Sequence, residues 1–305
     1  RPYEIPKGWY LLKKFYKHLV TKLKAKISEY RYFDQWILLY KLSDNEDIST
    51  SFFEFTRLTP PKDRFWGDPF VIYKNNTYYI FMEELIYKNG LGTIAVIEMD
   101  EKGNVKEAQP ILEKDYHMSY PFLIEDNGKL YMLPETKGNK TIELYECTDF
   151  PLKWKPKEVL FNNIRAVDST ILKHNGKYWL FTNIQENEGT FTSDDELFLF
   201  YSDSLLNGNW TPHPQNPIVS DVRFARPAGK IMVRNNRLFR PAQNCAKHYG
   251  HGMQIHEIIT LTEDAYKEIK IQAIFPDWDT DMISTHTLNH YHKLTFIDTK
   301  IKRKK

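Results

Sequence analysis

Five polar side chains that could bind or react with a ligand recur at corresponding places in the sequence. Each stands at the start of a short apolar segment, and these segments follow one another at intervals of roughly 50 to 60 residues. The five residues are Asp68, Tyr120, Asp168, Arg226 and His286. Gathered around one cavity, their carboxylates, guanidinium, imidazole and phenol would form a polar ligand site. The alternative is that they only cap strand ends and hold neighbouring strands together.

Further charged residues lie at the far ends of the aromatic-rich segments that follow. Glu135 comes after a proline in the motif LPET, and Arg240 comes before a proline in FRPAQ, so we interpret them as occupying related places in their repeats. Glu83 and Glu84 end an earlier segment of the same kind. These side chains either face the same site or are solvated charges at strand ends.

One tryptophan stands close to the first of the five positions. Trp66 lies two residues before Asp68, where its indole could stack on a sugar ring or pack between neighbouring elements. The chain as a whole is 15% aromatic, which favours strands and carbohydrate-stacking surfaces over helical bundles. Trp66 is therefore a candidate substrate-binding residue.

No sequence pattern indicates a metal or a cofactor, and we expect neither. His248, His251 and His256 lack the helical H-E-x-x-H order, and alternation along a strand would separate their rings. His251, on a loop between two glycines, is kept as a candidate substrate-binding residue. The sequence has no nucleophile elbow, P-loop or Gly-x-Gly-x-x-Gly turn, and nothing beside Cys147 or Cys245 would activate a thiolate. Both cysteines are therefore expected to be structural.

The candidate residues belong to a repeated β-hairpin. Each hairpin has a polar first residue, a short apolar strand, a tight turn of Asn, Gly or His type, and an aromatic-rich second strand. The five hairpins begin at Asp68, Tyr120, Asp168, Arg226 and Thr285. A third alternating segment and another extended stretch complete each unit. The third segments begin at Trp36, Ile94, Ile142, Leu197 and Met253.

The order of these segments predicts a closed ring. The chain begins with a third-strand segment and ends with a first-and-second-strand hairpin, so its two ends together complete a fifth sheet, and such a ring leaves only short, protected sheet edges. We therefore predict an all-β fold, a five-bladed β-propeller over residues 34–299. A basic amphipathic helix and linker in residues 1–33 would precede it, and a basic tail in residues 300–305 would follow. A two-sheet sandwich would not need complementary halves at the two ends.

Composition narrows the class of protein. The 305 residues carry 42 Lys and Arg against 40 Asp and Glu, and a net charge of +2 does not indicate a nucleic-acid partner. With 41% hydrophobic and 27% charged residues the chain is expected to be globular. It has no apolar run of the roughly 18 residues that a spanning helix needs. Two cysteines and no secretory leader make the cytoplasm the expected location.

Positive charge is concentrated at the two ends. Residues 1–30 hold eight basic and two acidic side chains, and residues 300–305 hold five basic ones. In residues 8–30, apolar side chains recur at steps of three and four between lysines, which predicts an amphipathic helix. Its apolar stripe either packs on the domain or an upstream neighbour, or lies on an anionic membrane surface. The first residue is Arg1 rather than Met, so we expect an upstream segment.

The repeat resembles known carbohydrate-active propellers. With Asp68-Pro69 opening the first inner strand and Asp168 opening the third, it is similar to glycoside hydrolase family 43 and its relatives in families 32, 62, 68 and 130. More closely, it resembles the N-terminal-type domain of glucosamine inositolphosphorylceramide transferase. The motifs that carry this resemblance are RFWGDPF (64–70), SYPFLIEDNGKLYMLPE (119–135), AVDST (166–170), FARPAG (224–229) and THT (285–287). Bacterial relatives of that domain are in some cases joined to a sugar formyltransferase-like domain, which implies such a domain as an upstream partner.

The hydrolase resemblance implies catalytic roles. Asp68 matches the general base of family 43, and Asp168 matches the aspartate that orients and tunes the acid. The general acid of that family is a glutamate, and Arg226 stands in its place. Glycoside cleavage needs one protonated and one ionised carboxyl group on opposite sides of the bond. Glu135 is then the expected acid, with Glu84 or Asp168 as alternatives.

The remaining candidates would bind substrate. The arginines and the histidine bring positive charge to the same mouth, which favours an anionic substrate such as a sugar phosphate or a nucleotide sugar. The full set of expected substrate-binding residues is Trp66, Tyr120, Arg226, Arg240, His251 and His286.

These features imply a carbohydrate-active protein that transfers or cleaves a glycosidic bond in surface polysaccharide or glycolipid biosynthesis. Its basic ends would allow peripheral contact with an anionic membrane. The alternative is a non-catalytic carbohydrate-binding module attached to a separate catalytic domain, and the missing family acid favours it. A protein-interaction platform is a third interpretation.

Overall fold

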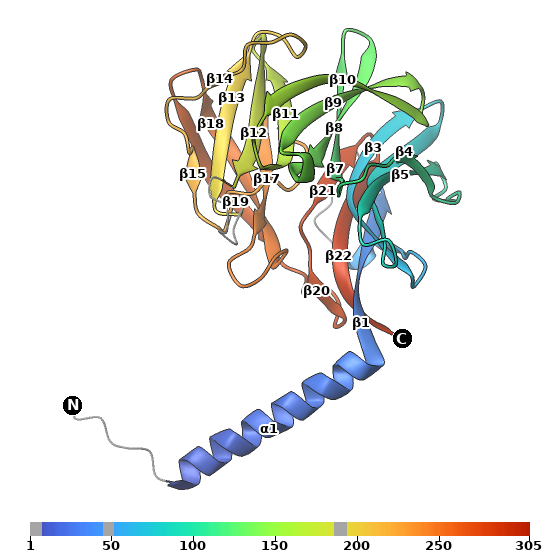
Figure 1. Cartoon of the computed structure of the whole chain (residues 1–305), viewed down its shortest axis with the longest axis vertical. Helices are drawn as coiled ribbons and strands as arrows, with labels where there is room; N and C mark the ends of the chain where they lie inside the picture. Colours follow the sequence, from blue (N-terminus) through green and yellow to red (C-terminus); the bar gives the residue numbers. More distant parts are fainter. Residues whose placement is uncertain (1–7, 45–51, 186–193) are drawn as a thin grey trace, which may run out of the picture.

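Five antiparallel sheets are arranged around a central axis, as the sequence predicted (Figure 1). The structure is a computed structural model that describes residues 8–44, 52–185 and 194–305; within the helix, the side chains of residues 24–29 are not described. The described residues form 22 strands, one α-helix and two 3-10 helices. The all-β five-bladed propeller is therefore confirmed.

Four blades are built from consecutive strands. The first contains β3 (Arg64–Lys74), β4 (Thr77–Ile86), β5 (Gly92–Asp100) and β6 (Gln109–Leu112). The second contains β7 (Ser119–Asp126), β8 (Lys129–Thr136), β9 (Thr141–Asp149) and β10 (Lys153–Asn162). The third contains β11 (Ala166–His174), β12 (Lys177–Ile184), β13 (Glu196–Ser202), β14 (Thr211–Pro212) and β15 (Val219–Ser220). The fourth contains β16 (Met232–Arg234), β17 (Arg237–Asn244), β18 (Gly252–Leu261) and β19 (Tyr266–Ile274).

The fifth blade joins the two ends of the chain. It contains β1 (Tyr32–Leu42), β2 (Thr56–Leu58), β20 (Met282–Ser284), β21 (Leu288–Tyr291) and β22 (Leu294–Lys304). β1 pairs with β22 along its full length, from Tyr32 opposite Lys304 to Leu42 opposite Leu294. The predicted closure is thus confirmed. The pairing continues past residue 299, where the sequence placed the start of a tail, so residues 300–304 are strand.

Helix α1 (Gly8–Arg31) projects away from the propeller, and its main contacts with the body are to β1 (Figure 1). The short 3-10 helices η1 (Phe52–Glu54) and η2 (Lys137–Asn139) lie in connections. No helix in the described part of the chain is long and apolar enough to cross a membrane.

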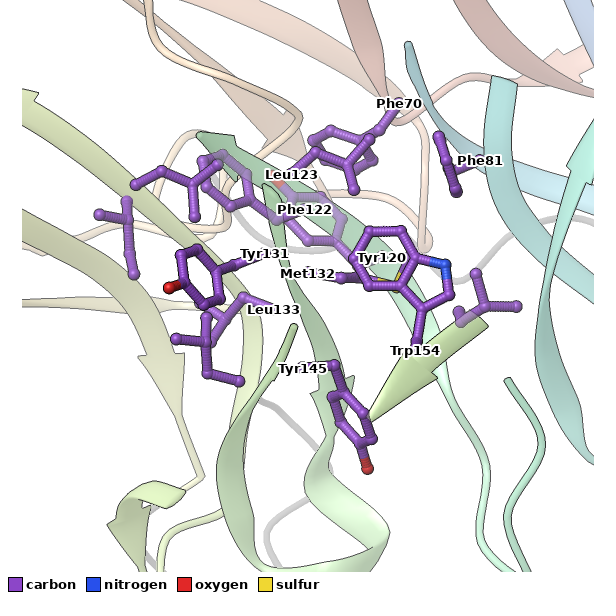
Figure 2. Packing of buried hydrophobic residues seen from close by; sticks show 14 of the residues in the cluster. Phe70, Phe81, Tyr120, Phe122, Leu123, Tyr131, Met132, Leu133, Tyr145 and Trp154 are labelled. Atoms are coloured by element: carbon purple, nitrogen blue, oxygen red, sulfur yellow. The ribbon is translucent and has the colours of Figure 1, made fainter. Parts of the chain in front are cut away.

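Aromatic side chains fill the spaces between blades. In the largest hydrophobic cluster, Phe70 of the first blade meets Tyr120 and Phe122 of the second edge to face, with ring centroids 4.9 and 5.7 Å apart (Figure 2). Phe81 meets Trp154 in the same manner at 5.7 Å. The high aromatic content therefore serves mainly to hold the blades in place.

The inner strand of the fourth blade is shorter than the repeat predicts. The sequence placed its start at Arg226, but β16 covers only Met232–Arg234. Pro227 has no N–H to donate, and Gly229 has a φ of +130°, so the chain here departs from strand geometry and keeps one isolated bridge, from Pro227 to Ala242. Arg226 is consequently held by its side-chain contacts rather than by a regular ladder.

Arg240 lies inside the fourth blade, not at the channel mouth. It donates to Glu268 at 2.6 and 2.8 Å and to the Phe224 carbonyl oxygen at 2.8 Å, and its side chain is only 1% exposed. The prolines next to Glu135 and Arg240 do not mark equivalent positions, because Glu135 is the seventh residue after its turn and Arg240 is the fourth. Positions an odd number of residues apart point to opposite faces of a strand.

Replacing Arg240 should therefore destabilise the propeller. We expect Arg240→Met to lower the free energy of unfolding by about 3–5 kcal/mol, because Glu268 is left buried without its counter-charge. Denaturant titration measures this change. The double variant Arg240→Met/Glu268→Leu should recover much of the loss; equal stabilities of wild type and the single variant would contradict the structural role.

Candidate functional site

A cavity of about 220 Å³ opens at one mouth of the central channel. Five of the residues singled out from the sequence line it: Asp68, Glu83, Glu135, Arg226 and His286. The complete lining consists of Trp36, Phe65, Gly67, Asp68, Glu83, His117, Ser119, Glu135, Arg226, Tyr249 and His286. The fold thus brings together residues from four of the five blades.

A repeated backbone irregularity sets the inner strands at this mouth. Asp68, Tyr120 and Asp168 all adopt left-handed backbone conformations, with φ of 51°, 46° and 50°. At each of them the register with the second strand shifts, as in a β-bulge. Positive φ is uncommon outside glycine and strained for tyrosine, and bulges often redirect a side chain near a functional site.

Asp68 is buried among hydrogen-bond donors. The hydroxyl of Thr287 donates to Oδ1 at 2.6 Å, and the backbone N–H of Tyr120 donates to Oδ2 at 3.3 Å. Burial raises the pKa of Asp68 to about 7, opposed by the nearby His286 and assisted by Asp168. Asp68 can therefore take up or release a proton near neutral pH.

His286 is oriented by a buried aspartate that the sequence analysis missed. Asp298 accepts from His286 Nδ1 at 2.6 Å, and from the backbone N–H groups of Asp68, His286 and Thr287 at 2.9–3.0 Å. Burial lowers the pKa of His286, but Asp298 and Asp68 outweigh it and raise the value to about 9. The imidazole stacks on Trp36, with ring centroids 4.1 Å apart. His286 is thus cationic at neutral pH, with Nε2 left for a ligand.

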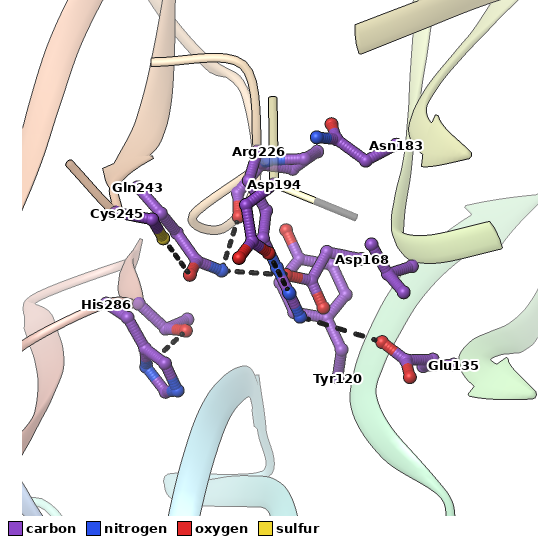
Figure 3. Close-up of polar contacts among 12 residues, drawn as sticks. Tyr120, Glu135, Asp168, Asn183, Asp194, Arg226, Gln243, Cys245 and His286 are labelled. Carbon is purple, nitrogen blue, oxygen red and sulfur yellow. Dashed lines mark hydrogen bonds and ion pairs between the residues drawn. The ribbon is translucent and has the colours of Figure 1, made fainter. Parts of the chain in front are cut away.

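Arg226 forms the centre of an ion-pair cluster (Figure 3). It donates from Nε to Asp168 and from Nη1 to Asp194, both at 2.6 Å, and its guanidinium carbon lies 5.0 Å from the centroid of the Tyr249 ring. Gln243 also donates to Asp168, at 2.7 Å. The charge of Arg226 is therefore largely compensated within the protein, which weakens its expected role as an anion clamp.

Glu135 faces the cavity with one free oxygen. Its Oε2 has no hydrogen-bond partner among the described residues and lies 3.8 Å from Nη2 of Arg226. Burial and the adjacent Asp168 raise the pKa of Glu135 to about 8, although Arg226 opposes them. The carboxyl group therefore holds its proton at neutral pH.

Three other expected residues are not among those lining the cavity. The hydroxyl of Tyr120 bonds Thr170 at 2.8 Å and accepts from the backbone N–H of Gly229 at 2.8 Å, so it bridges blades below the cavity. Trp66 is buried in an interblade cluster and donates to Glu84 at 3.0 Å. His251 packs against Phe275 and His248. Asp168 acts from behind the lining, through Arg226.

Several residues of the site escaped the sequence analysis. A common register could have found Asn183 and Gln243, since these two residues, like Glu83 and Glu135, are each the seventh residue after their turn. Trp36 begins a third segment of the repeat, but nothing in the repeat places that position at the site. Tyr249 and His117 lie in loops, which the repeat does not mark. Gly250, with φ of +67°, carries no Cβ, and an added one would lie 2.9 Å from the Trp36 ring; this absence lets the Tyr249 loop approach Trp36.

His117 and Glu83 form a second ionisable pair at the cavity. His117 Nε2 lies 3.1 Å from Glu83 Oε1, and the backbone N–H of Gly92 donates to Nδ1 at 3.0 Å. Glu83 raises the pKa of His117 despite the opposing effect of burial. This pair could exchange a proton with a ligand hydroxyl.

Asp68, His286 and Asp298 also lie close enough to share a metal ion, with candidate ligand atoms within 4.8 Å of one another. All four carboxylate oxygens of the two aspartates already accept hydrogen bonds from protein groups. We therefore treat the trio as a hydrogen-bonded cluster.

The fold and its axial, carboxylate-lined cavity define a five-bladed propeller of the architecture used by several glycoside hydrolases. Zg3597, a family 117 glycoside hydrolase from Zobellia galactanivorans, aligns with a TM-score of 0.55 and 13% identity over 88% of this chain and 90% of its own. The catalytic domain of a family 62 α-L-arabinofuranosidase from Coprinopsis cinerea aligns with a TM-score of 0.57 and 11% identity over 88% and 96%. At these identities the likeness establishes the fold alone.

Sequence comparison identifies the family. The family model described as "Glucosamine inositolphosphorylceramide transferase 1, N-terminal" matches residues 56–298, and the chain belongs to this family. Curated relatives named glucosamine inositolphosphorylceramide transferase 1 are 34% identical in Oryza sativa subsp. japonica and 33% identical in Arabidopsis thaliana, each over 210 residues and 68% of this chain. The matched region spans only 28% and 27% of those relatives. The resemblance expected from the motifs is confirmed.

The buried site should make the protein less stable as pH rises. Asp68, Glu135 and His286 have ordinary pKa values of 3.8, 4.5 and 6.5, and all three are raised in the folded state. The folded protein then binds more protons than the unfolded chain, so the free energy of unfolding should fall as pH rises from about 5 to about 9.

Thermal or denaturant unfolding across that pH range tests this. Asp68→Asn and Glu135→Gln should flatten the decline below about pH 8, whereas Glu125→Gln, at the opposite mouth of the channel, should leave it unchanged. A stability that rises over the same interval would contradict the assigned pKa directions.

Proposed function

We propose that this chain binds a sugar in the axial cavity and transfers or cleaves a glycosidic bond there. The main supporting observation is that Asp68 and Glu135 line one cavity in different environments. Both oxygens of Asp68 accept hydrogen bonds, whereas Oε2 of Glu135 accepts none from the described residues, and Glu135 has the higher pKa. A pair of carboxyl groups whose pKa values are separated by environment is typical of glycoside chemistry.

The roles follow from this separation. Glu135 would donate its proton to the leaving oxygen as the bond to the anomeric carbon breaks. Asp68 would accept the proton of the incoming hydroxyl, from water in cleavage or from an acceptor in transfer, or would itself attack as a nucleophile. Asp168 would keep Glu135 protonated, because its charge raises the Glu135 pKa.

The size and charge of the cavity indicate what it would hold. At about 220 Å³ it is smaller than the roughly 300–1,000 Å³ of drug-sized ligand sites, so a single sugar ring is the proposed occupant. Trp36 and Tyr249 supply aromatic surface for stacking. Because Asp168 and Asp194 compensate Arg226, we place the ring of a sugar or sugar phosphate in the cavity and any phosphate group outside it.

Participation in surface polysaccharide or glycolipid biosynthesis, at a cytoplasmic location, is part of the same proposal. The curated relatives carry glucosamine and inositolphosphorylceramide in their names, which are a sugar and a phosphate-containing lipid. The matched segment is about a quarter of their length, so a catalytic domain elsewhere in a longer protein is compatible with this role.

A second candidate function is a non-catalytic carbohydrate-binding module. One observation favours it: Arg226 occupies the position of the family 43 acid and is ion-paired with two aspartates. In that case the cavity would hold a sugar without turnover.

Site variants separate the two functions. With nitrophenyl glycosides as probes of cleavage and nucleotide sugars as probes of transfer, Asp68→Asn and Glu135→Gln should each lower turnover about 10²–10⁴-fold. The wild-type rate should be greatest between about pH 7 and pH 8, where Asp68 is ionised and Glu135 protonated. Glu125→Gln is the matched control. Sugar binding without turnover on any probe would favour the binding module.

Ligand binding should also be visible in fluorescence. Because Trp36 lines the cavity, a bound sugar should change the tryptophan emission of the wild type. Trp36→Phe should abolish most of this signal and weaken binding about tenfold through lost stacking. Trp66→Phe serves as the control, since Trp66 is packed between blades; an unchanged response in Trp36→Phe would place the sugar elsewhere.

A further inference from the structure

Helix α1 carries an apolar face that nothing in the described chain covers. Trp9, Leu12 and Phe15 are 75%, 67% and 66% exposed, and Tyr16, Leu19 and Leu23 are also exposed. At 100° per residue these six side chains fall on one side of the helix. We propose that α1 binds flat on the surface of an anionic lipid bilayer, with this face inserted between the lipid headgroups.

The charge of the helix matches such a surface. Lys13 and Lys17 border the apolar face on one side and Lys22 on the other, and residues 8–28 contain no Asp or Glu. A helix with a polar face rich in lysine and an opposite face of Trp, Phe and Leu is the pattern of interfacial membrane helices. Each lysine near an anionic surface adds attraction that salt screens.

The C-terminal strand extends the basic surface. The last residues of β22 lie beside the end of α1, and the backbone N–H of Lys305 donates to the Arg31 carbonyl oxygen at 3.0 Å. A shallow depression there is lined by Tyr30, Arg31, Tyr32, Lys304 and Lys305. Arg31 at the end of α1 therefore lies together with Lys304 and Lys305 of the C-terminus.

The same charges disfavour a second copy of the chain as the occupant. Two such helices packed through their apolar faces would bring the flanking lysines of both together without acidic partners, and like charges at these positions are destabilising. An anionic bilayer offers apolar depth and opposite charge at once.

The helix joins the propeller at the mouth that contains the candidate site. α1 ends at Arg31, five residues before Trp36 in β1. The part of β22 from Asp298 to Lys304 pairs with this part of β1. Membrane binding would hold this mouth near the bilayer surface. This last step depends on the proposed function: the cavity would then lie close to sugars carried on lipid. The vesicle experiment tests membrane binding alone and does not depend on that function.

Vesicle sedimentation with the full chain tests the proposal. We expect it to bind vesicles of phosphatidylcholine and phosphatidylserine in equal amounts, to bind pure phosphatidylcholine far less, and to lose binding at high salt. Phe15→Ser/Leu19→Ser and Lys13→Glu/Lys17→Glu should each lower the partition coefficient at least about tenfold. Ile271→Ser and Lys102→Glu, which change exposed residues of the propeller, are the matched controls.

The outcomes are distinguishable. Because the substituted side chains are exposed, the circular dichroism and unfolding temperature of the propeller should not change. No binding to anionic vesicles, or binding that the helix variants leave unaltered, overturns the proposal. Light scattering that shows a dimer dispersed by Phe15→Ser/Leu19→Ser, without vesicle binding, also overturns it in favour of self-association.

Discussion

The structure depends on the pairing of β1 with β22. This ladder joins the first strand of the propeller to the last, so the fifth blade is completed from both ends of the chain and the ring of blades is closed. It also builds the site, because Trp36 enters on β1 while Asp298 lies on β22, and the two hold the His286 ring from different sides. Closure of the ring and formation of the cavity thus depend on the same strand pairing.

Buried charge governs the chemistry of that cavity. Asp68, Glu135 and His286 are removed from water, and their mutual positions decide which of them carries a proton near neutral pH. Asp298 holds the imidazole cationic, and Asp168 favours the protonated form of Glu135. Perturbed pKa values of this kind cluster at functional sites, and these groups line a cavity at the mouth of the channel.

Arg226 marks the departure from the hydrolase propellers that the chain resembles in fold. The resemblance to family 43 implies a glutamate acid at this position, whereas this chain has a guanidinium that pairs with Asp168 and Asp194. The acid of the proposed function is instead Glu135, at the end of the second strand of another blade. The choice between glycosidic chemistry and sugar binding therefore depends on the carboxyl groups of Asp68 and Glu135 rather than on the fold.

The sequence alone determined the number of blades, the closure and five of the cavity's residues, because hairpin periodicity and a position at the start or end of a strand are local properties. The tertiary structure decided the rest. Arg240 was placed at the site because it was matched to Glu135 with an error of three residues, and an odd error reverses the face of the strand to which a side chain points. Trp66 and Tyr120 pack and hydrogen-bond between blades instead of lining the cavity. Asp298 contacts His286, and Asp194 and Tyr249 contact Arg226. Each of these partners lies on a different segment of the chain from the group whose pKa it changes. Only the folded arrangement of the segments brings them within contact distance.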